Sequence, residues 1–182
     1  MRKLSVLVIA TALSVPAWSQ TSETPRATPL LSILSTQTVT PTPAAAPDDV
    51  DTMDDVIHAM YQAISGPAGQ KRNWDRFRSL FLPDARLILA IGRQGQKPSA
   101  RILTVEDYIR RADRIFEKES FWENERGRNT EKSGNIAHAF SYYESRQVKN
   151  GKPFQTGVNS IQLFNDGTRW WIATVMWNTG RE

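Results

Sequence analysis

The sequence predicts an α+β domain in which three helices come before a curved, mostly antiparallel sheet. Apolar residues recur at spacings of three and four over residues 53–64 and 105–116, which is typical of amphipathic helices. Residues 121–178 instead contain β-prone runs separated by Asn-Gly, Asp-Gly and Ser-Gly-Asn turns, which favour antiparallel hairpins. A shorter amphipathic segment around Trp74 supplies the remaining helix.

Each expected helix has its own start signal. Asp51 or Thr52 can cap the first helix, and Asn73 can cap the second. Thr104 and Asp107 form a capping-box pattern at the start of the third helix. These side chains satisfy backbone N–H groups that the first turn of a helix leaves unpaired.

The sheet is expected to contain one brief strand before the third helix and a meander of long strands after it. The brief strand covers residues 86–91 and is followed by a polar loop over 92–99. The long strands are expected near 121–132, 135–148, 153–164 and 168–178. Gly151 and Gly167 are expected to take positive φ in their turns, and Gly157 is interpreted as a bend point.

The N-terminal segment, residues 1–19, has the pattern of a cleaved secretory signal. A basic start precedes an apolar run over 4–15 that is too short to span a bilayer comfortably. Ala17 and Ser19 are small residues at positions −3 and −1 of a cut after Ser19. We therefore expect an exported protein, periplasmic or secreted, that has no membrane association after the signal is removed.

Residues 20–51 are expected to form a flexible linker. They are rich in Thr, Pro, Ala and Ser, a composition that buries too little apolar surface to offset the entropy of ordering the chain. Its one apolar patch covers residues 30–34. The folded domain is then expected over residues 52–182.

Composition narrows the range of partners and cofactors. The formal net charge of +4 falls to about +2 once Arg2 and Lys3 leave with the signal, and the basic residues are mixed with acids, so no nucleic-acid partner is expected. There is no cysteine, which excludes disulfides, thiolate metal sites and cysteine nucleophiles. The sequence has no Gly-rich phosphate loop and no metal-ligand spacing, so neither a cofactor nor a metal is expected.

Three sequence motifs, in this order of elements, resemble the nuclear transport factor 2-like superfamily, also called SnoaL-like. They are Trp74-x-x-Phe77-x-x-Leu80-Phe81-x-Pro83-Asp84-Ala85, Gly134-Asn135-Ile136-Ala137-His138-Ala139-Phe140-Ser141, and Asn159-Ser160-Ile161-Gln162-Leu163 followed by Gly167-Thr168-Arg169-Trp170-Trp171-Ile172. The resemblance covers residues 52–178 and is specific for the fold but not for a function. It implies a cystatin-like cone, in which the curved sheet wraps the helices around a pocket.

The last strand is apolar on both of its faces. Strict alternation places Trp170, Ile172, Thr174 and Met176 on one side and Trp171, Ala173, Val175 and Trp177 on the other. The second apolar face is consistent with a subunit interface, a closed cavity or a two-sided core. The resemblance implies pairing on the outer side of the sheet, and we expect a homodimer.

The candidate catalytic residues are the ionisable groups that could point into the cone. The resemblance implies acid–base chemistry by a few side chains in an apolar pocket, where burial moves a pKa toward neutrality. The candidates are His138 and the pair Glu123 and Glu125, which share one face of a strand. The alternative is a hydrogen-bonded core histidine and two solvated or ion-paired glutamates.

Three functions remain open at this point. The leading one is a non-catalytic domain that binds a small apolar molecule or a partner, with Tyr142, Asn159 and Trp171 as ligand-pocket residues. The others are a cofactor-independent acid–base enzyme of the isomerase, dehydratase or cyclase type, and a homodimerisation module. An ionisable group facing into the cone favours the enzyme, and a cone filled by aromatic rings favours the module.

Overall fold

The computed structural model describes residues 42–92, 95 and 97–180. The expected signal and most of the expected linker lie outside the described residues. The elements follow one another in the order η2 (Pro47–Asp49), α1 (Met53–Ile64), α2 (Trp74–Ser79), β1 (Phe81–Ile91), β2 (Ser99–Thr104), α3 (Val105–Phe116), β3 (Trp122–Ser133), β4 (Ile136–Arg146), β5 (Gln155–Asn165) and β6 (Trp170–Gly180). None of the described helices is long and apolar enough to cross a membrane.

Helix starts follow the expected capping residues. The Thr52 side chain accepts a hydrogen bond from the Asp55 backbone N–H, and the Asp55 carboxylate accepts from the Thr52 backbone N–H. Thr104 and Asp107 form the same reciprocal pair at α3. The Asn73 side chain caps α2.

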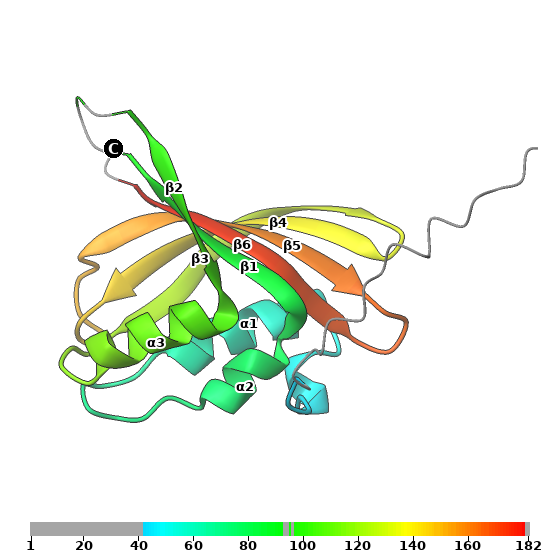
Figure 1. Cartoon of the computed structure of the whole chain (residues 1–182), viewed down its shortest axis with the longest axis horizontal. Coiled ribbons are helices and arrows are strands. Elements are labelled where there is room, and N and C mark those ends of the chain that lie inside the picture. Colours follow the sequence, from blue (N-terminus) through cyan, green and yellow to red (C-terminus); the bar gives the residue numbers. More distant parts are fainter. Residues whose placement is uncertain (1–41, 93–94, 96, 181–182) are drawn as a thin grey trace, which may run out of the picture. The chain divides into compact units, whose positions relative to one another are not determined.

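The sheet has six strands in the order β2-β1-β6-β5-β4-β3. Strands β3 to β6 form the expected antiparallel meander, while β1 joins β6 in parallel. Figure 1 shows the curved sheet arching over the helices, which lie together on one side of it. The structure thus confirms the predicted α+β class.

The strand before α3 was predicted too short, and its partner was missed. Strand β1 covers Phe81–Ile91 and pairs with β2, Ser99–Thr104, as an antiparallel hairpin. The sequence of β2 has no clear alternation, and four of its first five side chains, up to Leu103, are exposed. Only Leu103 is buried there, so hydrophobic patterning gave no strand signal.

Strand β6 contains one extra residue relative to its neighbour. Leu163 of β5 pairs with Ile172, whereas Gln162 pairs with Thr174, so Ala173 has no partner in β5. A bulge of this kind shifts the alternation of side chains by one position beyond it.

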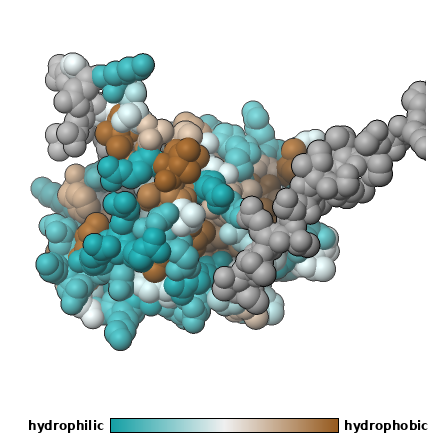
Figure 2. Space-filling view, in the orientation of Figure 1, coloured by the Kyte–Doolittle hydropathy of each residue, from teal (hydrophilic) through white to brown (hydrophobic). Residues whose placement is uncertain are grey.

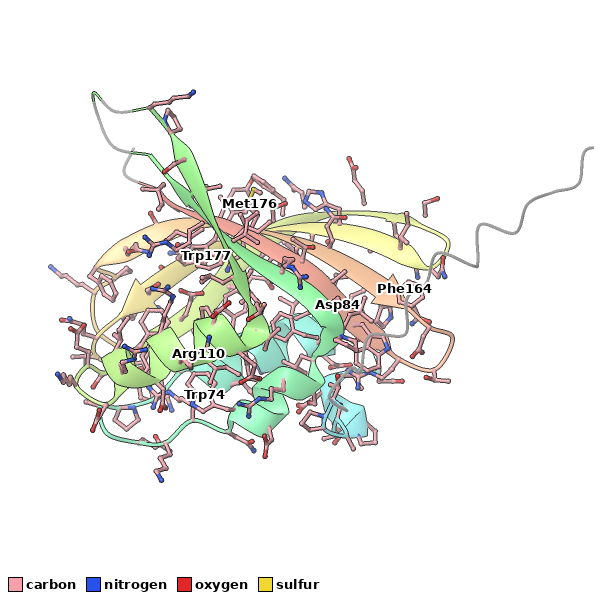
Figure 3. All side chains as sticks on the ribbon, in the orientation of Figure 1. Trp74, Asp84, Arg110, Phe164, Met176 and Trp177 are labelled. Atoms are coloured by element: carbon pink, nitrogen blue, oxygen red, sulfur yellow. The ribbon has the colours of Figure 1, made fainter. Side chains whose placement is uncertain are left out.

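The bulge overturns the expected division of the last strand into two faces. Trp170, Ile172 and Val175 are all buried, although strict alternation would place Val175 opposite the other two. Trp177 lies on the same, helix-facing side as Val175. Figure 3 labels Met176 and Trp177 on opposite sides of the β6 ribbon.

The connection between β4 and β5 differs from the expected tight hairpin. Strand β4 ends at Arg146 and β5 begins at Gln155, so residues 147–154 form a longer loop. Gly151 does not take positive φ there, whereas Gly167 does, with φ 96°. The Asn-Gly signal was therefore wrong for this turn, because the strands separate before they reach it.

The domain begins before Thr52, which corrects the expected linker boundary. Val50 is buried, and its carbonyl accepts a hydrogen bond from the Trp170 N–H at 2.9 Å. The Asp49 carboxylate forms an ion pair with Arg76 at 2.7 Å. These contacts hold the end of the expected linker against α2 and the start of β6.

Candidate functional site

A cavity of about 200 Å³ lies between the helices and the inner face of the sheet. Its lining combines apolar and aromatic side chains with two tyrosines, two amides and one carboxylate: Met60, Ile64, Phe77, Leu87, Tyr108, Phe121, Glu123, Tyr143, Gln155, Asn159, Val175 and Trp177. A concave, mainly apolar site with a few polar groups is the usual form of a small-molecule site.

Glu123 is the carboxylate of this cavity. It stands at the start of β3, where the alternation of the strand turns it toward the helices, and only 8% of it is exposed. The hydroxyl of the fully buried Ser145 donates a hydrogen bond to Glu123 Oε2 at 2.8 Å. Burial raises the pKa of Glu123 to about 7, although the Ser145 hydroxyl and the nearby Asn159 amide oppose the rise.

The two tyrosines of the cavity lie close enough to Glu123 to be affected by its charge. Burial, reinforced by the negative charge of Glu123, raises the pKa of Tyr143 to about 12 and also raises the pKa of Tyr108. Both hydroxyls therefore stay protonated at neutral pH. The Tyr143 hydroxyl donates to the Asn178 carbonyl at 3.0 Å and accepts from Gln155 Nε2 at 3.1 Å.

Two of the residues selected from the sequence meet in this cavity, Glu123 and Asn159. Glu125 shares the inward phase of β3 but lies beyond the cavity, at a second hollow of about 490 Å³ between α1 and β3. There its carboxylate accepts a hydrogen bond from Ser141 at 2.6 Å and pairs with Arg128 at 3.2 Å.

The other three candidates are not among the residues that line the cavity. His138 and Tyr142 have the opposite phase of β4, on the outer face of the sheet, where His138 Nε2 lies 2.9 Å from Ser160 Oγ. Trp171 donates its indole N–H to Asp166 at the turn before β6. Alternation alone could not say which phase of β4 faces the helices.

Sequence reasoning missed Tyr108, Tyr143, Gln155 and Trp177 as cavity residues. Tyr108 was visible only as part of the buried stripe of α3. Tyr143 lies on the phase of β4 opposite to His138. The bulge at Ala173 determines the side of β6 on which Trp177 lies.

In the part of the chain that the structure describes, no three His, Cys, Asp or Glu side chains converge as a metal site. The polar groups of the cavity itself are one carboxyl, two amides and two phenols.

No protein-family model matches the chain, and no curated protein matches it. Among solved structures, it is similar to a protein of unknown function with a cystatin-like fold from Nostoc punctiforme, with a TM-score of 0.53 and 9% identity over 72% of this chain and 95% of that one. It is also similar to a nuclear transport factor 2-like protein of unknown function from Pseudomonas putida, with a TM-score of 0.52 and 11% identity over 71% and 85%. A third is LinA, with a TM-score of 0.50 and 11% identity over 72% and 85%.

These likenesses show the fold. The chain has the nuclear transport factor 2-like, cystatin-like architecture that its motifs imply. Since one fold supports many chemistries, function must be argued from the cavity.

Proposed function

We propose that this chain binds a small, mostly apolar ring compound in its cone and that Glu123 exchanges a proton with the bound molecule. The observation that carries the proposal is a carboxyl group buried in an apolar cavity with its pKa raised to about 7. A group that titrates near the working pH can both accept and donate a proton. The reaction class is cofactor-independent acid–base chemistry.

The other cavity residues supply binding rather than proton transfer. The rings of Phe77, Phe121 and Trp177 offer flat apolar surfaces, which suit a cyclic ligand. The Gln155 amide offers a donor and an acceptor, and the Asn159 carbonyl oxygen offers a further acceptor, for one polar group of that ligand. A ligand would enter with its polar group toward these amides and an acidic hydrogen near Glu123.

Non-catalytic binding is the second candidate function. It is favoured by the tyrosines, because the raised pKa values of Tyr108 and Tyr143 leave Glu123 without a second cavity group that titrates near neutrality. In that case Glu123 would serve as a hydrogen-bonding group for the ligand.

The experiment uses small cyclic ketones as probes, in deuterated buffer at pH 7, with the wild type and Glu123→Gln. Ligand-observed NMR reports binding, and loss of the α-hydrogen signals reports proton exchange. We expect both proteins to bind a probe and only the wild type to accelerate exchange. If both proteins bind a probe but neither accelerates exchange, the function is non-catalytic binding. If neither protein binds a probe, both candidate functions are wrong.

We further propose that the outer face of the sheet is a homodimer interface. Five of the eight exposed large apolar side chains among the described residues belong to this face: Ile102, Ile136, Phe140, Tyr142 and Met176. Strand register places Phe140, Ser160, Met176, Ile88 and Ile102 in one row across five strands. Figure 2 shows hydrophobic surface where β1 and β2 cross the sheet and mainly hydrophilic surface over the helices.

Export remains a proposal from the N-terminal pattern alone. A basic start, an apolar run and a small-residue cleavage site support removal of residues 1–19. N-terminal sequencing of the exported protein should find Gln20, or a residue within a few positions of it, as the first residue. Retention of Met1 on exported protein would contradict this.

A further inference from the structure

A chain of hydrogen bonds leaves the cavity through α1 and ends at the second hollow. Asn159 Nδ2 donates to Tyr61 Oη at 3.0 Å, and Tyr61 Oη lies 2.7 Å from Ser141 Oγ. Ser141 Oγ donates to Glu125 Oε1 at 2.6 Å. Asn159, Tyr61 and Ser141 are buried, and Glu125 is half-buried at the hollow between α1 and β3.

The donor and acceptor roles along this series of hydrogen bonds are fixed by Glu125, at its outer end. The Glu125 carboxylate, paired with Arg128, can only accept, so the single hydroxyl hydrogen of Ser141 is committed to it. Tyr61 must then donate its own hydrogen to Ser141. The Tyr61 oxygen is left as an acceptor, and it can face only the nitrogen end of the Asn159 amide.

We propose that Glu125, Ser141 and Tyr61 are positioning residues that hold the nitrogen end of the Asn159 amide toward Tyr61 and Glu123. The proposal rests on the proposed function only in giving Glu123 a chemical role; the hydrogen-bond chain itself needs no ligand. The surface carboxylate thereby determines, through two buried hydroxyls, which end of a cavity amide faces the acid–base group.

The orientation matters because the two ends of an amide have opposite effects on a carboxyl. A donated N–H stabilises the carboxylate, whereas a carbonyl oxygen in the same place stabilises the protonated acid. Asn159 lines the same cavity as Glu123, and its amide opposes part of the rise that burial causes in the pKa of Glu123. An amide free to flip would lose that effect.

Three tyrosines from neighbouring elements are close enough to Glu123 to be affected by its charge. Tyr61 of α1 belongs to the hydrogen-bond chain, whereas Tyr108 of α3 and Tyr143 of β4 do not. Tyr108 and Tyr143 are untouched by the substitutions below, so their influence is constant across the variants.

The test is a titration of the Glu123 carboxyl by carbon-13 NMR, with the signal assigned by its absence in Glu123→Gln. In Tyr61→Phe and in Ser141→Ala, we expect the Glu123 pKa to rise by about half a pH unit or more, because the amide loses its fixed direction. Tyr142→Phe removes a phenol hydroxyl from the outer face of the same sheet and should leave the titration unchanged.

An unchanged Glu123 titration in a folded Tyr61→Phe protein would overturn the proposal. Should Tyr61→Phe fail to fold, Ser141→Ala decides in the same way, since it breaks the chain by removing one oxygen atom. The titration is done without ligand, so failure of the proton-exchange assay would refute the proposed function and leave this result standing.

Discussion

Tyr143 passes over Gly157 so closely that no side chain fits at that position. A Cβ atom added to Gly157 would lie 2.5 Å from the Tyr143 hydroxyl oxygen and 2.5 Å from the Asn178 carbonyl oxygen. The tyrosine reaches from β4 across β5 to the backbone of β6, where it donates its hydrogen bond. The glycine thus allows a wall of the cavity to form.

Gly157→Ala should displace Tyr143 and destabilise the domain. Overpacking a close contact of this kind typically costs about 1–3 kcal/mol, and the free energy of unfolding in urea measures it. Gly92→Ala is the matched control, because a Cβ there meets no atom of the described residues within 4 Å. If Gly157→Ala and the wild type have the same free energy of unfolding, Tyr143 can move away from position 157 without destabilising the domain.

The pH dependence of stability should change when Glu123 is replaced. Its pKa is about 7 in the folded protein and about 4.5 when unperturbed, so the folded state holds the proton more tightly than the unfolded state. The resulting stabilisation is complete below about pH 4.5 and disappears as the pH rises through 7. One pKa unit corresponds to about 1.4 kcal/mol, so the loss is roughly 3 kcal/mol.

Glu123→Gln should therefore gain stability relative to the wild type as the pH rises from 4.5 to 8. The measurement is urea unfolding at several pH values across that range. Glu131→Gln, which replaces an exposed carboxyl on the same strand, is the control and should follow the wild type. Parallel curves for Glu123→Gln and the wild type would mean that the carboxyl is solvated.

The helices and the meander could be predicted because their signals are local. The side chains of Thr52, Asn73 and Thr104 each cap backbone N–H groups within one helical turn. A turn that contains Gly likewise reverses the chain direction through its own few residues. The parallel pairing of β1 with β6 could not be predicted in this way, since it joins segments almost the whole domain apart.

The cavity was predicted only in part because side-chain direction depends on sheet register. Glu123 and Asn159 were selected from the sequence and line the cavity, whereas Trp171 was selected and does not. One unpaired residue, Ala173, changes the phase of β6 and turns Trp177 inward instead. No sequence pattern marks that bulge, because both phases of the strand are apolar.

The folded domain should need the residues just before α1. A chain that begins at Thr42 should be more stable than one that begins at Asp51, because only the first keeps Val50 in the core and Asp49 on Arg76. Full burial of one valine contributes about 1.5–3 kcal/mol. Thermal unfolding of the two proteins measures the difference, and equal melting temperatures would place the domain boundary at α1.

The outer face of the sheet should hold two copies of the chain together. Phe140 lies at the middle of β4, the strand next to the sheet edge formed by β3, and makes edge-to-face contacts with His138 and Tyr142, so it belongs to an aromatic cluster of the kind that anchors interfaces. A carboxylate placed there would be buried in the apolar interface of a two-fold dimer, which is costly. Phe140→Asp should therefore give a folded monomer.

The measurement is light scattering at tens of micromolar, about the range in which a stable dimer persists. It should give the mass of a dimer for the wild type and of a monomer for Phe140→Asp. Val148→Asp introduces the same charge at an apolar side chain that is 68% exposed but lies in the loop after β4, away from the strand face. It should remain a dimer. A monomeric wild type would refute the interface, while a monomeric Val148→Asp would place the contact at the loop instead.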